Sequence, residues 1–232
     1  MKLVFIHGSG GTGRVWKYQT EHFPGSVAVT LPGHPEGAPC GSIEEATRWL
    51  RSELGSEAGA EALVLVGHSL GGAIALQYAL EHRDEVAGIV LVGSGARLRV
   101  HPATLKALEQ AIERPKSFEK MFAESFRKVS PDFAKELGEL TNFLGPAPFL
   151  NDLRACDQFD LTDRLGEIVV PTLAIAGTED VMTPSKYSAF LEERMPKASV
   201  QIIDGGTHFA FAEYPDEVNQ AIADFVASLA AA

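Results

Sequence analysis

Apolar residues gather in six short runs along the chain, and helical patterns separate most of these runs. The strand-like runs occupy residues 3–6, 27–31, 62–66, 86–92, 172–176 and 199–203. The helical patterns fall at about 15–23, 43–54, 70–82, 185–194 and 215–229. Short continuous apolar runs are typical of strands buried on both faces, and alternation with helices predicts a parallel sheet covered on both sides. We therefore expect an α/β fold with a mainly parallel six-stranded sheet.

One interval, residues 97–165, interrupts this alternation. It has no strand-like run but three amphipathic helical patterns, and it holds seven of the 13 phenylalanines. The apolar positions of the three patterns are Leu105, Leu108 and Ile112, then Phe118, Met121, Phe122, Phe126 and Val129, then Phe133, Leu137, Leu140 and Leu144. We predict one core, built from residues 1–96 and 166–232, with an inserted helical lobe at 97–165.

The stretch Gly67-His68-Ser69-Leu70-Gly71 lies where the third apolar run changes into a helical pattern. It matches G-x-S-x-G, in which a strained strand-to-helix turn raises the serine hydroxyl above the sheet edge. The helix start that follows directs amide donors toward the space above that hydroxyl. The pattern predicts Ser69 as a nucleophile, with an ordinary strand-to-helix turn as the alternative.

A serine hydroxyl is a weak nucleophile unless a base accepts its proton, so one of the seven histidines is expected nearby. His208, in "IIDGGTHFAF", follows the last strand-like run and therefore emerges at the same sheet edge as Ser69. His7 and His68 also reach that edge, but each lies in a tight glycine-flanked turn, which indicates local hydrogen bonding. The other four are predicted to be surface or loop residues: His22, His34, His82 and His101.

The base needs a carboxylate to orient it, and "PTLAIAGTEDVMTP" places Asp180 in the loop that leaves the fifth run at this edge. Its neighbour Glu179 is the alternative acid. A third interpretation is that Asp180 caps a helix or a loop.

The glycine-rich stretch "HGSGGTG" at 7–13 follows the first strand-like run. Preorganised amide donors stabilise the oxyanion of a tetrahedral intermediate, and the backbone N–H groups of Ser9 and Leu70 are the predicted donors. A loop of this kind can also bind phosphate. However, it lacks the lysine of a P-loop, and no ribose-binding acid follows the second run, so phosphate binding is the weaker interpretation.

Charge and cysteine content narrow the class of partner and the compartment. The chain has 232 residues with 31 acidic and 20 basic side chains, a formal charge of −11 that disfavours nucleic acid and anionic membranes as partners. Only Cys40 and Cys156 are present, in no zinc-binding spacing, which fits a reducing cytoplasm. The apolar run near the N-terminus is too short for a signal peptide or a membrane span. We expect a cytoplasmic enzyme of small molecules without a metal.

These stretches together resemble the α/β-hydrolase fold superfamily over nearly the whole chain. "HGSGG", "LPGH", "GHSLGG", "PTLAIAGTEDVMTP" and "GGTHFAFAEYPDEVNQAIADF" occur in the order of that family. The resemblance implies Ser69 as nucleophile, Asp180 as acid and His208 as base, which is the family's chain order. It also implies an oxyanion hole formed by the Ser9 and Leu70 amides, and a helical cap at residues 97–165.

Two departures from the family pattern refine the expectation. Many members begin with an antiparallel pair of strands, whereas this sequence starts at the strand before "HGSGG", so the sheet is expected to be shortened and all-parallel. Ala73 stands where relatives of the menaquinone-pathway synthase usually carry arginine, which disfavours lyase activity. A serine nucleophile disfavours the haloalkane dehalogenase and epoxide hydrolase relatives, which use aspartate.

The leading hypothesis is a carboxylic ester hydrolase that forms an acyl-enzyme on Ser69 and needs no cofactor. Phenylalanines of the lobe would then face small or medium hydrophobic acyl esters, although at least half of them are expected to pack the lobe's own core. One alternative is carbon–carbon bond hydrolysis or lysis with the same triad, with Arg127 and Arg154 as anchors for a charged substrate. Another is a small-ligand-binding protein with little turnover.

Overall fold

Six strands form one sheet in the computed structural model, which describes residues 1–55, 61–114, 118, 121 and 125–230. The strands are β1 (Lys2–Ile6), β2 (Val27–Val29), β3 (Leu63–His68), β4 (Val86–Val92), β5 (Thr172–Gly177) and β6 (Ala198–Ile203). Their order is β2-β1-β3-β4-β5-β6, and every neighbouring pair is parallel. The predicted six-stranded, all-parallel sheet is confirmed. β2 ends two residues before the end of its apolar run.

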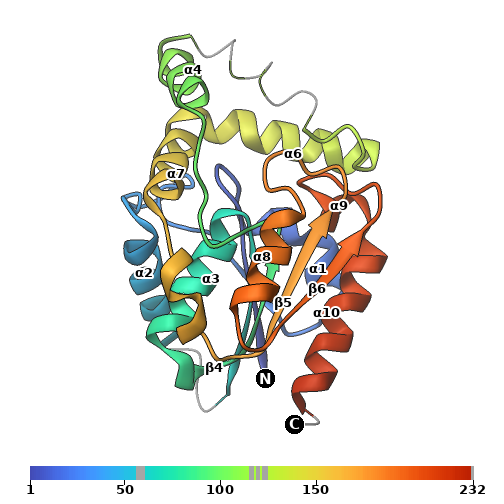
Figure 1. The fold of residues 1–232 in the computed structure, drawn as a ribbon. Helices are drawn as coiled ribbons and strands as arrows, with labels where there is room; N and C mark the ends of the chain where they lie inside the picture. The colour runs from blue at the N-terminus through green and yellow to red at the C-terminus, as the bar shows by residue number, and fades with distance from the viewer. Residues whose placement is uncertain (56–60, 115–117, 119–120, 122–124, 231–232) are drawn as a thin grey trace.

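Successive side chains of each strand point to opposite faces, and each face packs against its own helices. Val4 and Ile6 belong to the core on one face, whereas Phe5 belongs to the core on the other. The first face is covered by α2 (Ile43–Gly55), α3 (Leu70–Glu81) and α8 (Lys186–Arg194), and the second by η1 (Gly13–Trp16), α1 (Lys17–His22) and α10 (Pro215–Ala230). Figure 1 shows this three-layer arrangement. Two further short helices are η2 (Arg83–Glu85) and α9 (Ala210–Glu213).

The strand order reverses its direction of growth at β1 and β3, which are neighbours in the sheet. The chain leaves β1 toward η1 and α1 on one face, and it leaves β3 toward α3 on the other. In open α/β sheets ligands bind in the crevice outside the carboxyl ends of the strands at such a point. Residues 7–13 and Ser69 both lie there.

The segment between β4 and β5 lies over the carboxyl ends of the strands, at the opposite end of the molecule from both termini (Figure 1). Its described helices are α4 (Pro102–Glu113), α6 (Pro131–Leu144), α7 (Pro146–Gln158) and η3 (Thr162–Glu167). Where the chain leaves and rejoins the body, Arg97 and Asp160 form an isolated antiparallel bridge. Beside it, the Leu161 N–H donates to the Ala96 carbonyl at 2.8 Å.

The three predicted amphipathic patterns meet different outcomes. The first and third correspond to α4 and α6. The second falls in part outside the described residues, Phe122 among them, while residues 125–129 form turns and a bend. The sequence did not predict α7. Its Pro146 and Pro148 resemble helix breakers, but both occupy the first turn, where backbone N–H groups have no helical acceptor to lose.

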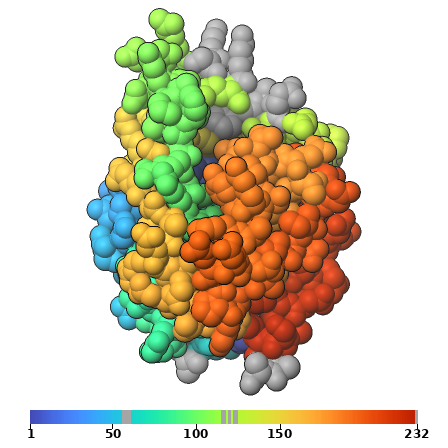
Figure 2. Space-filling model, viewed as in Figure 1, coloured from blue at the N-terminus to red at the C-terminus, as the bar shows by residue number. Residues whose placement is uncertain are grey.

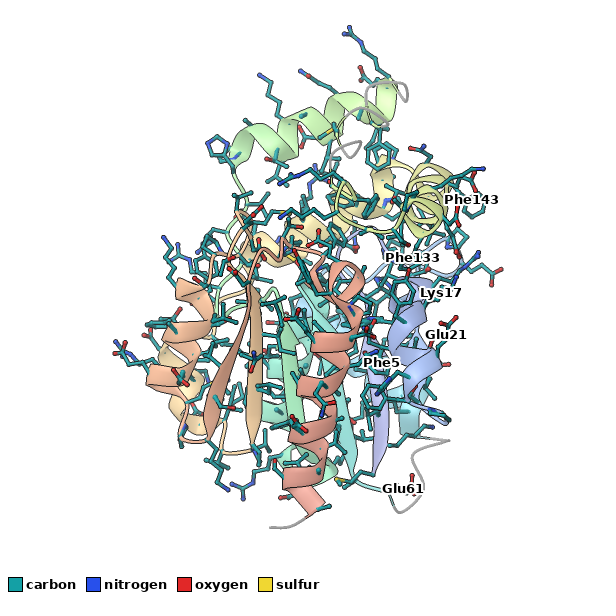
Figure 3. All side chains as sticks on the ribbon, turned by 90° about the vertical axis from the view of Figure 1, so that its right-hand side faces the viewer. Phe5, Lys17, Glu21, Glu61, Phe133 and Phe143 are labelled. Carbon is teal, nitrogen blue, oxygen red and sulfur yellow. The ribbon has the colours of Figure 1, made fainter. Side chains whose placement is uncertain are left out.

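The phenylalanines of this segment have different environments. Phe118 and Phe149 pack with Leu108 and Leu153 in a cluster between α4 and α7, so they serve the segment's own core. Phe133 joins the core of the body, where Lys17 of α1 lies over its ring at 5.6 Å (Figure 3). Phe143 points away from the molecule, and 72% of it is exposed.

On the front of the molecule, the residues that lead from β4 into α4 lie against the region that follows β5 (Figure 2). Ala96 and Arg97 of the first segment and Tyr187 of the second line a surface cleft where the two segments meet. Within the described ranges, no helix has both the length and the apolar character that crossing a bilayer requires.

Candidate active site

Ser69 lies in a strained turn between β3 and α3. Its φ of 51° and ψ of −112° make it the one non-glycine residue with positive φ in the described part of the chain. The Ser69 N–H donates to the Val92 carbonyl at 2.9 Å, and the Ser94 hydroxyl donates to the Ser69 carbonyl at 2.8 Å. A backbone in this region costs on the order of 1–3 kcal/mol and persists only where its surroundings fix it. The strand–turn–helix context that G-x-S-x-G requires is present.

A residue larger than glycine does not fit at position 67. A Cβ added there would overlap the carbonyl oxygen of Gly71, because the turn brings the end of β3 against the start of α3. Close backbone approach therefore requires glycine at position 67.

His208 and Asp180 form a buried pair. The Nδ1–H of His208 donates to Oδ2 of Asp180 at 2.8 Å, and both side chains are at most 8% exposed. The alternative acid, Glu179, lies on the surface, where it pairs with Lys128 at 2.7 Å and Arg127 at 3.7 Å. Of the two acids considered from the sequence, the structure brings Asp180 to the histidine.

Further donors fix the Asp180 carboxylate as an anion. Its Oδ1 accepts the N–H groups of Met182 and Thr183 at 2.8 and 2.9 Å, and its Oδ2 accepts the Thr183 hydroxyl at 2.7 Å. Burial alone would raise the pKa of Asp180, but the hydrogen bond and charge of His208 and the donors of Thr183 outweigh it and lower that pKa. Asp180 is therefore ionised at neutral pH and can orient the imidazole.

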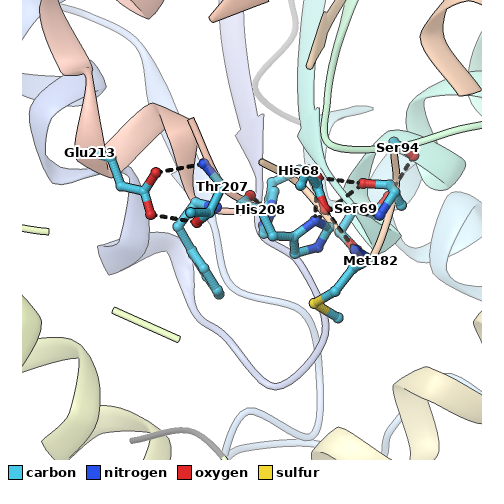
Figure 4. Close-up of polar contacts among 10 residues, drawn as sticks. His68, Ser69, Ser94, Met182, Thr207, His208 and Glu213 are labelled. Carbon is cyan, nitrogen blue, oxygen red and sulfur yellow. Dashed lines mark hydrogen bonds and ion pairs between the residues drawn. The ribbon is translucent and has the colours of Figure 1, made fainter. Parts of the chain in front are cut away.

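The loop that carries His208 is fixed by its own hydrogen bonds. The N–H and hydroxyl of Thr207 both donate to the Glu213 carboxylate, the former at 2.8 Å (Figure 4). The His208 carbonyl lies 2.9 Å from Nε2 of His68, so the residue before Ser69 holds the residue proposed as its base.

Ser69 and His208 line the same cavity, together with Met182 (Figure 4). Both residues are described, and no hydrogen bond joins the serine hydroxyl to the imidazole in this conformation. The Nε2 atom of His208 likewise has no hydrogen-bond partner among the described residues. The ring is thus held through Nδ1 and leaves Nε2 available to a group in the cavity.

The cavity has a volume of about 60 Å³, several times the roughly 10–15 Å³ that one water molecule needs. Most of the described residues that line it are apolar or small, and none of these is Asp, Glu, Lys or Arg. They are Ser9, Gly10, Gly11, Val15, His68, Ser69, Ser125, Phe126, Leu137, Leu140, Thr141, Phe149, Leu153, Met182, His208 and Phe209.

The predicted oxyanion donors have backbone N–H groups available. Within the described chain, the N–H groups of Ser9 and Leu70 make no hydrogen bond, and Leu70 is the first residue of α3. By contrast, the Gly10 N–H donates to Oδ2 of Asp152 at 2.8 Å and the Gly11 N–H to the Gly8 carbonyl at 3.1 Å. Ser9 lines the cavity, and the unpaired Leu70 amide directly follows the cavity residue Ser69 in the chain.

His7 and His68 make the local hydrogen bonds that their turns indicated. His7 lies beside the Gly8 carbonyl at 2.8 Å and accepts the Leu31 N–H at 3.0 Å. Burial and the charge of His34 lower the pKa of His7 to about 4, and burial with the charge of His208 holds the pKa of His68 well below its usual value. Both rings are neutral at pH 7.

The interpretation of His34 needs correction. It lies in a loop, as expected, but it is buried, with 3% of its surface exposed. Its Nε2 lies 2.9 Å from Oδ2 of Asp152, a buried carboxylate on α7. Sequence reasoning missed this pair, because α7 was not predicted and nothing local distinguishes Asp152 from an exposed helical acid. The motif "LPGH", quoted above for the family resemblance, was the sequence feature that could have drawn attention to His34.

Possible metal ligands are sparse in what the structure describes. Within the described ranges, no group of three or more His, Cys, Asp or Glu side chains is arranged to hold a metal ion. Cys40 and Cys156 are both free thiols.

Comparison with known proteins agrees with this geometry. The sequence profile of the alpha/beta hydrolase family matches residues 3–221. A pimeloyl-[acyl-carrier protein] methyl ester esterase of Vibrio vulnificus is 31% identical over 92% of this chain and 89% of its own. A solved thermophilic esterase superposes with a TM-score of 0.82 at 29% identity, over 98% of this chain and 90% of that one. A bromoperoxidase of Bacillus anthracis, 24% identical with a TM-score of 0.86 over 97% and 91%, shares the fold. The chain belongs to the alpha/beta hydrolase family.

Proposed function

We propose that this protein is a carboxylic ester hydrolase that works through an acyl-enzyme on Ser69. One observation carries the proposal: Ser69 and His208, the partner of Asp180, line one cavity at the carboxyl edge of the sheet together with Ser9, whose amide is unpaired among the described residues. The relationship to a methyl ester esterase and to a thermophilic esterase supports ester hydrolysis as the general reaction.

In the first half of the reaction, the Ser69 hydroxyl attacks the acyl carbon while Nε2 of His208 takes its proton. Rotation of the serine side chain brings its oxygen to Nε2. Asp180 keeps the proton of the imidazole on Nδ1 and stabilises the imidazolium that forms. The proton then passes from Nε2 to the leaving alcohol oxygen, and the acyl group stays on Ser69.

The second half repeats these transfers with water in place of the serine. His208 takes a proton from water, the resulting oxygen attacks the acyl carbon, and the proton returns to Ser69 as the acid leaves. In both halves the substrate's carbonyl oxygen gains negative charge. The N–H groups of Leu70 and Ser9 donate to that oxygen, and each such donor is worth roughly a hundredfold to a thousandfold in rate. This sequence of steps requires no metal or organic cofactor.

The lining of the cavity indicates the class of acyl group. Leu137, Leu140 and Leu153 face it, and among the described residues no Asp, Glu, Lys or Arg lines it. A volume of about 60 Å³ is small for a ligand site. We therefore propose small, uncharged acyl esters as the preferred substrates.

We propose that the helical segment at 97–165 acts as a cap on the core formed by residues 1–96 and 166–232. Its α6 and α7 supply cavity residues such as Leu140 and Phe149, while the triad comes from loops of the core. In this arrangement the core fixes the chemistry and the cap fixes the size of the acyl group.

Carbon–carbon bond hydrolysis of a charged substrate is less well supported. Its proposed anchors, Arg127 and Arg154, do not line the cavity. Each has a carboxylate partner at the surface instead, Glu179 at 3.7 Å and Glu109 at 2.7 Å. A charged substrate would therefore find no counter-charge among the described residues that line the cavity.

A panel of p-nitrophenyl esters tests the proposal. Acetate, butyrate, octanoate and laurate esters are compared with a vinylogous diketone, and kcat/KM is measured for each. The expected result is highest kcat/KM for acetate or butyrate, a burst of p-nitrophenol from acyl-enzyme formation, and no cleavage of the diketone. Preferential cleavage of the diketone would favour the carbon–carbon hydrolase. Absence of turnover with saturable ligand binding would favour the binding protein.

A further inference from the structure

Helix α7 contacts the proposed oxyanion loop with one face. Asp152 accepts the Gly10 N–H at 2.8 Å, and the thiol of Cys156 lies 3.7 Å from the Ser9 hydroxyl. Phe149 packs so closely on Gly10 that a Cβ there would overlap its ring. Residues 149, 152 and 156 share one face of a helix because they are spaced three and four apart. These contacts with α7 therefore fix the Ser9–Gly10 peptide.

The partner of Asp152 is a histidine whose two ring nitrogens both face acceptors. Nδ1 of His34 lies 3.1 Å from the Leu31 carbonyl oxygen and 3.3 Å from that of Pro32, and Nε2 lies 2.9 Å from the Asp152 carboxylate. A carbonyl oxygen only accepts, so Nδ1 carries a proton, and a carboxylate also only accepts, so Nε2 carries one as well. This geometry fits an imidazolium at His34 that faces the Asp152 carboxylate.

The other titratable groups beside this pair leave its charge unchanged. The His7 ring, 5.0 Å from that of His34 between centroids, is neutral because its pKa lies at about 4. Burial raises the pKa of the Cys40 thiol, so it too is uncharged. Burial alone would lower the pKa of His34, but the hydrogen bond and charge of Asp152 and the two carbonyl contacts outweigh it and raise that pKa.

A carboxylate near an oxyanion hole would ordinarily oppose catalysis, because negative charge develops there in the transition state. The imidazolium of His34 cancels the charge of Asp152 within the pair. Asp152 can therefore hold the Gly10 N–H without adding net negative charge beside the Ser9 amide. The Gly10 N–H is turned to Asp152, while Ser9 lines the cavity with a backbone N–H that has no partner among the described residues.

We propose that Asp152, paired with a doubly protonated His34, is a positioning residue for the oxyanion hole. It fixes the Ser9–Gly10 peptide so that the Ser9 N–H meets the developing oxyanion, and it makes the catalytic geometry depend on α7. This inference rests on the proposed ester hydrolysis, in which Ser9 is an oxyanion donor.

Two variants and a matched control test this role with p-nitrophenyl acetate. Asp152→Ala removes the acceptor, so kcat is expected to fall about 10- to 100-fold, up to the worth of one oxyanion donor, while KM changes less than about threefold. A trifluoromethyl ketone forms a tetrahedral adduct on the serine, and its inhibition constant is expected to rise by the factor lost in kcat/KM. Asp152→Asn keeps an oxygen acceptor and is expected to restore most of kcat.

The control is Asn151→Ala on the same helix. Asn151 donates to the Cys40 carbonyl at 2.8 Å, so this change also removes a bond between α7 and a core loop, but not one to Gly10. Its kcat is expected to equal that of the parent. Equal losses of kcat in Asn151→Ala and Asp152→Ala, or an unchanged kcat in Asp152→Ala, would overturn the positioning role.

A measurement that needs no turnover tests the charged pair separately. Nitrogen-15 spectra of the histidine rings at pH 7.5 are expected to show both His34 nitrogens protonated in the parent, and one in Asp152→Asn. A neutral His34 ring in the parent would overturn the pair. A parent protein that cleaves no ester would instead overturn the proposed function, and the spectra would still decide the state of His34.

Discussion

Two buried aspartate–histidine pairs lie at the carboxyl edge of this sheet, and they are alike in distance and burial. Asp180 meets His208 at 2.8 Å, and Asp152 meets His34 at 2.9 Å. All four side chains are at most 8% exposed. Distance and burial alone would give both pairs the same role.

The second ring nitrogen separates them. Nε2 of His208 has no hydrogen-bond partner among the described residues and belongs to a cavity-lining ring, whereas Nδ1 of His34 is fixed by the carbonyls of Leu31 and Pro32. A ring with one free nitrogen can gain and lose a proton as a reaction proceeds, and a ring saturated with acceptors keeps both of its protons. An Asp–His pair is therefore identified as a proton shuttle by what its outer nitrogen faces.

The largest effect is expected from a change of Ser69, the residue proposed to give its proton to His208. Ser69→Ala removes the proposed nucleophile, so kcat for p-nitrophenyl acetate is expected to fall by about 10⁵-fold or more, because triad members act as a unit. The fold should be unchanged, since alanine meets the same backbone strain as serine. Steady-state kinetics and thermal unfolding measure the two quantities. Turnover within tenfold of the parent would remove Ser69 from the mechanism.

Asp180→Asn tests the pair itself. The amide can no longer stabilise the imidazolium or hold its proton on Nδ1, so kcat is expected to fall about 10⁴-fold while the substrate still binds. The control is Glu179→Gln, one residue earlier in the chain. Glu179 lies on the surface beside Lys128 and Arg127, so its kcat should stay within about twofold of the parent, the range of a weak surface pair. A large loss of kcat in Glu179→Gln would show that the assignment of Asp180 as the acid is wrong.

The first pair illustrates what sequence could predict. Strand ends are visible as apolar runs that stop, and parallel strands end at one edge, so residues that follow the third, fifth and sixth runs had to approach one another. From this rule, the sequence alone predicts that Ser69, Asp180 and His208 lie close together. The six-stranded parallel sheet followed from the same runs. The predictions of a cytoplasmic location and of no nucleic-acid or membrane partner depended on composition alone and stay predictions.

The second pair illustrates what sequence could not predict. His34 follows a short strand in a loop rich in proline and glycine, and its burial depends on α7, which lies 118 residues away in sequence. That helix was missed because Pro146 and Pro148 in its first turn resemble loop residues. Long-range partners of this kind leave no local periodicity, so a buried histidine and an exposed one look alike in sequence.

The contact of α7 with the oxyanion loop predicts an opposite response of two glycines to the same change. Gly10 has a φ of +65°, and a Cβ there would overlap the Phe149 ring, so Gly10→Ala is expected to destabilise the protein by roughly 2–5 kcal/mol. Gly138 lies inside α6 with no atom of the described residues near its added Cβ, so Gly138→Ala should stabilise by about 0.5–1 kcal/mol. Urea unfolding measures both. An unchanged free energy of unfolding in Gly10→Ala would show that α7 can move away from residue 10 at little cost.

The smallest expected effect is a pH dependence of stability that reports on the second pair. The pKa of His34 is raised in the folded state, so above pH 6.5 the folded protein keeps a proton that the unfolded chain releases. The free energy of unfolding should therefore fall as pH rises from 6.5 toward 8, by less than about 1.4 kcal/mol per pH unit.

Below pH 6.5 the sign reverses, because His7 and His68 have lowered pKa values and stay neutral while their unfolded counterparts bind protons. Stability should then rise with pH toward 6.5, so the parent has its maximum near that value. Asp152→Asn removes the partner that raises the pKa of His34, and the fall above pH 6.5 should disappear while the rise below it remains. Urea unfolding across pH 5 to 8 separates the two limbs. Equal falls in parent and variant above pH 6.5 would show that another group binds the proton, and the second pair would lose its charged state.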